Sequence, residues 1–357
     1  MAFKIFLTGV TGYIAGDALF ALARRYPEAD CEFAALVRSP EAAAKVRAAY
    51  PRVRIVMGAL EDAEVLRREA AWADLVLHAA DAAEHISAAL AIASGLVEEH
   101  SPSRPGYWLH TGGLGILTYF DAAAERFGEP PSDLVFDDLD GVAALTNLPD
   151  EAFHREVDKI VLECGTKYGD SVRTALVCAP TIYGNGRGPV ATRGRQCYEM
   201  AKVILTRGYI PIIGTGEARS GNVHIHDLTE AYILLISAAL AGNSSHELWG
   251  AKGYHLPVTG EHAWGPLARA MGSAAQQMGL LPSPRVGSKE KEKIQEYQMS
   301  KDEALEAAGW DGMSWGMNAR GKGLRLEKFL GWKANHPSLE DEVPGIVRAE
   351  AERLGLS

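Results

Sequence analysis

Short apolar blocks separated by polar, helix-forming segments run through the first half of the chain. Apolar runs that end at glycine or polar residues indicate buried strands at 3–9, 31–38, 52–58, 73–80 and 106–113. Segments of helical character lie between them, at 13–26, 39–50, 61–71 and 83–99. In the second of these, Ser39 and Pro40 form a typical helix start. Strands joined through helices predict right-handed βαβ crossovers and a parallel sheet covered on both faces.

The same alternation continues to about residue 250 and then changes. We expect a helix around 151–168, strands at 172–179 and 222–227, and a buried helix over the apolar stretch 231–241. From about residue 252, glycine and tryptophan become frequent and charged helical segments dominate. The predicted fold class is therefore α/β, a Rossmann-type doubly wound parallel sheet with a smaller, mainly helical C-terminal lobe. Residues 1–184, with 222–245 returning to them, are assigned to the sheet domain, and 185–221 with 246–357 to the lobe.

Composition narrows the range of partners. The 357 residues carry a formal net charge of −10, which disfavours nucleic acid as the main partner because phosphate backbones require clustered Lys and Arg. The basic run 288–293 is interrupted by glutamates and is typical of a solvated surface. Four widely spaced cysteines and the absence of a secretory or membrane-spanning pattern favour a reduced, cytoplasmic protein without a membrane partner.

The segment "TGVTGYIAG" (8–16) follows the first strand and opens a helix, as a phosphate-binding turn does. Gly9 permits the tight turn, and Gly12 lets the backbone approach a pyrophosphate at the helix N-terminus. A plain turn is the alternative. The second strand ends in "LVRS", where an acidic residue would hold a ribose 2′-hydroxyl; Arg38 instead suits a 2′-phosphate. NADP(H) is thus favoured over NAD(H), unless Arg38 only points into solvent.

These residues resemble the extended short-chain dehydrogenases/reductases, which include the NAD-dependent epimerase/dehydratase group. The likeness covers most of the chain and rests on "TGVTGYIAG", "LVLHAA" (75–80), Lys159, "APTIYGNGRGP" (179–189) and "NVHIHDLTEAY" (222–232). Within the group, the chain looks like fungal-type proteins with an HR-VDK helix. The resemblance implies a Rossmann domain, a substrate lobe and often homodimers. It also implies cofactor contacts from Thr8, Gly9, Thr11, Gly12, Tyr13, Ile14, Arg38, Leu60, Ala79, Lys159 and Pro180.

The chain departs from this family at the proton donor. Relatives carry a Tyr four residues before the Lys, on the same helix face, so that the ammonium lowers the pKa of the phenol. Here that position is Arg155, whose guanidinium stays protonated and cannot shuttle a proton. The second catalytic group of the family, a Ser or Thr after the fifth strand, is represented by Thr111, followed by Gly112 where relatives often have serine.

Three side chains are candidates to replace the missing acid. His154, with Asp158 one turn later, could form a proton relay or only a surface contact. Tyr183 could donate a proton if Lys159 lowers its pKa, or could only pack against the cofactor. His110, at the end of the fifth strand, could polarise a carbonyl or simply satisfy backbone groups. Arg155 itself could steady an oxyanion, which suggests an anionic or phenolic small-molecule substrate.

The segment "HIHD" (224–227) invites comparison with a metal site. His224 and His226 would share a strand face, but no third ligand is apparent in the sequence, so no metal is expected. Asp227 and Glu230 fit a helix-capping pair instead.

Three functions remain in competition. The leading hypothesis is an NADP(H)-dependent oxidoreductase of a small carbonyl or hydroxyl compound, with Lys159, Arg155, Thr111, His154 and Tyr183 as candidate catalytic residues. The rivals are a non-redox isomerase, epimerase or lyase on the same fold, and a non-catalytic NADP(H)-sensing protein.

Overall fold

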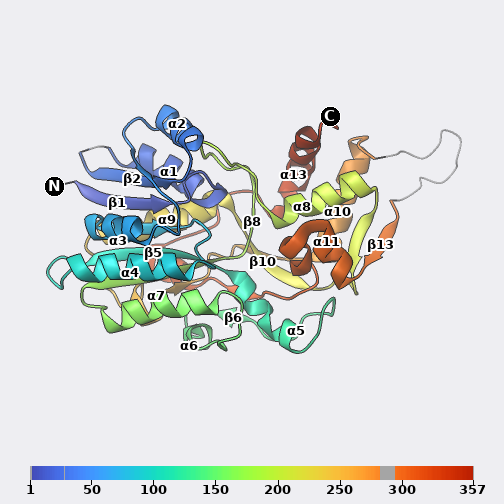
Figure 1. Cartoon of the computed structure of the whole chain (residues 1–357). Coiled ribbons are helices and arrows are strands. Elements are labelled where there is room, and N and C mark those ends of the chain that lie inside the picture. The colour runs from blue at the N-terminus through green and yellow to red at the C-terminus, as the bar shows by residue number, and fades with distance from the viewer. Residues whose placement is uncertain (1, 28, 282–293, 357) are drawn as a thin grey trace, which may run out of the picture.

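Seven parallel strands form the central sheet, in the order β11-β7-β5-β4-β1-β2-β3 (Figure 1). The computed structural model describes residues 2–27, 29–281 and 294–356. The strands are β1 Phe3–Thr8, β2 Cys31–Val37, β3 Arg54–Met57, β4 Leu75–His78, β5 Gly106–Gly113, β7 Val172–Ala179 and β11 Tyr254–His255. The predicted α/β doubly wound fold is confirmed.

Helices cover both faces of the sheet because its strands are apolar on both sides. One face carries α1 Tyr13–Arg25, α2 Pro40–Ala49, α9 Ile225–Leu240 and α12 Arg325–Leu330; the other carries α3 Ala63–Trp72, α4 Ile86–Glu99 and α7 Arg155–Lys167. In β1, Ile5 and Leu7 join the first core and Phe6 the second, as the two-residue strand period requires. Ser39 caps α2 through the backbone N–H of Ala42, as predicted.

A third apolar core holds the C-terminal lobe together, on the right of Figure 1. It is built from α8 Gln196–Arg207, α10 Trp264–Gln277, α11 Lys301–Ser314 and α13 Leu339–Leu354, with β9 Ile210–Ile213 paired to β13 Glu296–Met299. Between lobe and sheet lie β8 Thr181–Tyr183, β10 Arg219–His224 and β12 Gly260–Ala263, which form a small sheet, and the pair β6 Phe136–Asp137 with β14 Gly321–Lys322. Short helices α5 Tyr119–Ala123 and α6 Val142–Thr146 complete this region.

Several boundaries differ from the sequence prediction, and three of these differences affect the region of the site. β11 joins the central sheet although it belongs to the segment 246–357 assigned to the lobe. The strand predicted at 222–227 ends at His224, because α9 begins at Ile225. The helix predicted from residue 151 begins at Arg155, after His154 adopts a left-handed conformation with φ 71°.

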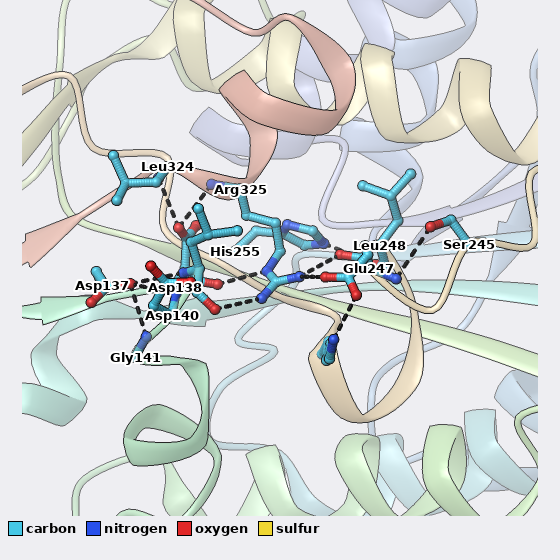
Figure 2. Close-up of polar contacts among 12 residues, drawn as sticks. Asp137, Asp138, Asp140, Gly141, Ser245, Glu247, Leu248, His255, Leu324 and Arg325 are labelled. Atoms are coloured by element: carbon cyan, nitrogen blue, oxygen red, sulfur yellow. Dashed lines mark hydrogen bonds and ion pairs between the residues drawn. The ribbon is translucent and has the colours of Figure 1, made fainter.

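A buried arginine joins three distant segments at the β11 edge (Figure 2). Arg325 is fully buried and donates to the carbonyl oxygens of Asp138, Leu139 and Glu247 at 2.6–3.1 Å. The Asp138 carboxylate accepts the backbone N–H groups of Leu256 and Arg325. Because its donors are all directed at protein acceptors, this cation stabilises the fold and is not free to bind a substrate.

Within the described residues, no helix is both long and apolar enough to cross a membrane. All four cysteines are buried and unpaired with one another.

Candidate functional site

The glycine-rich turn lies where the strand order reverses, at the carboxyl ends of β1 and β4. In open α/β sheets this crevice is where ligands bind. Gly9 has φ +80°, and a Cβ built on it would lie 2.9 Å from backbone atoms of Ala79 and Ala80. Only glycine fits, since both the conformation and the space exclude a side chain. The turn is therefore pressed against the end of β4.

Thr8 supports the contact between Gly9 and the end of β4. Its Oγ1 lies 3.2 Å from the backbone N of Ala79, 3.3 Å from that of Ala80 and 2.7 Å from Nδ1 of His78. The side chain is fully buried. Thr8 thus shapes the cradle from inside the sheet.

The first turn of α1 is suited to an anion. Gly12 is its N-cap and supplies no side-chain cap, so the amides of the first turn have no intrahelical acceptor. The Tyr13 hydroxyl donates to the carbonyl of Gly184 at 2.5 Å, and the backbone carbonyl of Thr11 accepts the N–H of Ala191. These bonds hold the 184–191 loop over the cradle, with Ile14 partly exposed beside it.

The remaining predicted cofactor residues fall into two groups. Arg38 follows β2, is exposed, and has no hydrogen bond or ion pair in the described part of the chain. Leu60 and Ala79 are partly buried beside the crevice, and Pro180 is buried. These features fit a dinucleotide that carries phosphate groups. The amides at the start of α1 are free, Gly9 leaves room only for backbone, and Arg38 has no partner among the described residues.

Lys159, by contrast, lies at the surface. Its Nζ is 3.0 Å from a carboxylate oxygen of Asp150, and the two side chains are 39% and 71% exposed. Arg155 is buried and donates from Nη2 to the carbonyl of Thr146 at 2.8 Å, while its Nε and Nη1 have no partner in the described structure. Arg155 is therefore buried and Lys159 exposed, although both were candidate catalytic residues.

His154 occupies the position facing the end of β5. A Cβ on Gly113 would lie 2.9 Å from its Nε2, and one on Gly115 3.7 Å away. Its Nδ1 contacts a carboxylate oxygen of Glu84, in the loop after β4, although the pair does not have hydrogen-bond geometry in the described structure. Burial lowers the pKa of His154 to about 4, so the ring is neutral at neutral pH. Burial, with Asp81 nearby, raises the pKa of Glu84.

Asp158 is not the partner of His154, so neither the proton relay nor the surface contact considered for this pair is found among the described residues. It lies on the sheet side of α7, where its Oδ2 accepts the Tyr254 hydroxyl at 2.9 Å. Its Oδ1 lacks a partner among the described residues and lies 3.5 Å from a Cβ built on Gly112. Burial raises the pKa of Asp158 to about 7.

The sequence did not point to Glu84 as the partner of His154, because no motif marks a single acidic residue in a loop.

The other candidate donors are committed or enclosed. Thr111 is buried, with Oγ1 2.7 Å from the Tyr232 hydroxyl. Tyr183 donates to the carbonyl of Pro337 at 3.0 Å, and burial raises its pKa, which is opposite to the shift that proton donation by a lysine-assisted phenol requires. His110 is fully buried beneath the site, and burial holds its pKa well below the usual value, with His78 and His154 adding to the effect.

Two predicted details near the C-terminal end of β10 are wrong. The N-cap of α9 is His224, whose Nδ1 accepts the backbone N–H of His226, and not Asp227. The expectation that no third ligand accompanies His224 and His226 also fails, because His336 joins them. Burial lowers the pKa of His224 to about 4, with His226 and His336 contributing.

Comparison with known proteins finds a relative that matches the chain over its full length. The chain is 39% identical, over 363 aligned positions spanning both proteins completely, to the oxidase ucsJ of an Acremonium species. The chain belongs to the family of this oxidase. No protein-family model matches the sequence.

Solved structures with the same architecture share little sequence. They include the dTDP-glucose 4,6-dehydratase DesIV of Streptomyces venezuelae, with NAD and TYD bound, at TM-score 0.63, 17% identity and coverage of 99% and 98% of the two chains. The UDP-glucose 4-epimerase of Thermotoga maritima follows at TM-score 0.61, 13% identity and 98% and 99% coverage. The fold is thus that of the epimerase/dehydratase enzymes.

Proposed function

We propose that the protein is an NADP(H)-dependent oxidoreductase that interconverts a hydroxyl and a carbonyl group on a small molecule, with His154 and Glu84 in place of the usual tyrosine. The observation that carries the proposal is the His154–Glu84 pair, whose ring faces the end of β5 beside the dinucleotide cradle. The name of the full-length relative, an oxidase, agrees with redox chemistry. The dehydratase DesIV binds NAD on the same fold.

In this proposal the protein binds the cofactor and moves one proton. The amides of α1 would hold the pyrophosphate, and Arg38 would hold a 2′-phosphate. A bound nicotinamide dinucleotide supplies the hydride acceptor or donor. The neutral His154 ring accepts the substrate hydroxyl proton at Nε2, while the Glu84 carboxylate orients the ring at Nδ1 and stabilises the imidazolium.

Backbone strain at His154 supports a functional role. A non-glycine residue at φ 71° costs on the order of 1–2 kcal/mol, and such residues concentrate at active sites. The conformation starts α7 and directs the ring toward Gly113. Arg155, with two buried donors unpartnered in the described structure, remains a candidate to face an anionic substrate group.

The cofactor preference is tested at Arg38. Replacing Arg38 with Ala removes the charge-assisted bonds to a 2′-phosphate, which contribute about 1.5–3 kcal/mol, so NADPH affinity should fall about 10- to 100-fold. NADH affinity should change little. Arg25→Ala, at the far end of α1, is the matched control. Equal affinities for NADPH and NADH in the unaltered protein would contradict the NADP(H) assignment.

The chemistry is tested at His154 and Glu84. Absorbance at 340 nm, followed with NADP⁺ and alcohols or NADPH and carbonyl compounds, reports turnover. His154→Ala should lower kcat by about 10²-fold or more, as loss of a general base does, while NADPH binding is retained. Glu84→Gln should lower kcat less, and His246→Ala, at an exposed histidine, should have no effect. Tight NADPH binding without turnover over the panel would favour the rival sensor function.

A further inference from the structure

Three histidines meet between the sheet domain and the lobe. His224 ends β10, His226 lies in the first turn of α9, and His336 lies on the segment that leads into α13. Their ring centroids are 4.7 Å (His224–His226), 4.8 Å (His224–His336) and 5.0 Å (His226–His336) apart. One ligand-capable atom from each lies within 4.8 Å of the others. His226 and His336, which are 110 positions apart in the chain, therefore lie side by side.

In two of the rings one nitrogen is already hydrogen-bonded to an acceptor, as it is in metal-bound imidazoles. Nδ1 of His336 lies 2.7 Å from Oδ1 of Asp227, which leaves Nε2 as the free lone pair. Nε2 of His226 lies 3.0 Å from the carbonyl of Asn185, which leaves Nδ1 free. A carboxylate or a carbonyl on the far nitrogen is the usual support of a metal-binding imidazole. The proton of each ring is assigned to the nitrogen that faces its acceptor.

The supporting carboxylate is itself held in place. Asp227 is buried, and its Oδ1 also accepts the backbone N–H of Asn335 at 3.0 Å. Among the described residues no Lys or Arg pairs with Asp227, so its negative charge is not compensated by a fixed cation. The nearby Asp17 differs, since Arg187 and Thr229 both bind its carboxylate. A divalent cation among the three rings would supply the charge that Asp227 lacks.

The third ring must give up a bond to take part. Nδ1 of His224 accepts the N–H of His226 at 3.1 Å, so ligation through Nε2 moves the ring proton to Nδ1 and breaks this cap. In a tetrahedral zinc site, nitrogen ligands at 2.0–2.1 Å lie about 3.3 Å apart, closer than in the present cluster. Movement of His336 can shorten these distances, because its side chain is 36% exposed. The same exposure opens the site to solvent.

We propose that His224, His226 and His336 form a binding site for a zinc-class divalent cation, with the fourth position open to water. Imidazole ligands select Zn²⁺, Co²⁺, Ni²⁺ or Cu²⁺ over Mg²⁺ and Ca²⁺, which prefer oxygen. The ion would fasten the segment before α13 to β10 and α9. The site shares no residue with the His154–Glu84 pair and does not depend on the proposed redox function.

The test uses the full chain, with any affinity tag removed and metal stripped by a chelator that is then dialysed away. Titration with Co²⁺ should give one ion per chain and the intense visible absorption of four-coordinate cobalt. Calorimetry with Zn²⁺ should show an affinity that falls more than about tenfold in His336→Ala and in His226→Ala. His246→Ala is the control and should match the unaltered protein.

A second substitution separates ligation from folding. Asp227→Asn keeps the shape of the side chain but removes its charge, and zinc affinity should fall about 10- to 100-fold. Thermal unfolding without metal should show that His336→Ala, at an exposed position, is folded. Zinc affinity equal in His336→Ala and the unaltered protein would overturn the proposal, as would cobalt spectra of the six-coordinate aqueous type.

Discussion

The buried carboxyl of Asp158 should make the stability of this protein depend on pH. The side chain is 1% exposed, and its Oδ1 has no partner in the described structure. Burial raises its pKa from 3.8 to about 7, against the opposing effects of the Tyr254 hydroxyl and Arg155. Replacing Asp158 with Asn leaves a neutral side chain of the same shape that can still accept from Tyr254.

The sign and size follow from linkage between protonation and folding. The folded protein holds the proton more tightly than the unfolded chain, so the contribution to stability is fully present below pH 4 and is lost as pH rises toward 7. A shift from 3.8 to about 7 is roughly three pKa units, each about 1.36 kcal/mol, or about 4 kcal/mol in all. Asp158→Asn should be close to the unaltered protein near pH 4 and more stable by up to about 4 kcal/mol above pH 7.

Urea unfolding at fixed pH values between 4 and 8 measures this difference. Groups common to both proteins cancel in the subtraction, which isolates the carboxyl at 158. Asp150→Asn is the control, because that carboxyl is exposed and its pair with Lys159 contributes about 0–1 kcal/mol. A stability difference for Asp158→Asn that stays constant across this pH range would refute the reasoning.

Two further substitutions test the cradle and the strand behind it. Gly9→Ala should destabilise the protein and abolish NADPH binding, whereas Gly208→Ala, with a similar φ of +73° but no atom within 4 Å of its Cβ, should show only the conformational cost of about 1–2 kcal/mol. Similar thermal unfolding of these two variants would mean that the backbone contact at Ala79 is unimportant. Tyr232→Phe leaves the buried Thr111 hydroxyl unpaired and should cost about 1–3 kcal/mol with kcat retained. A large loss of kcat at unchanged stability would instead return Thr111 to the catalytic residues.

Local sequence was sufficient for the sheet domain. The strands β5 at 106–113 and β7 at 172–179 have the predicted bounds, and Ser39 caps α2 as expected. Apolar period, capping chemistry and glycine position all act within a few residues, so they can be read from the chain without knowledge of its partners. The cradle at Gly9 was predictable for the same reason.

The site required contacts that local patterns do not encode. Helical spacing predicts that Arg155 and Lys159 share one face of a helix. In the structure α7 begins only after the left-handed residue His154, and Lys159 pairs with Asp150 at the surface. Glu84 reaches His154 from a loop seventy residues earlier, and no periodicity marks it.

The sequence by itself determined which segments become strands and helices, and where a phosphate-binding turn could form. Only the tertiary structure decided which polar side chains meet, including His336 beside His224 and His226. The physical reason is that secondary structure follows from neighbours along the chain, whereas a site is assembled by packing between segments far apart in it.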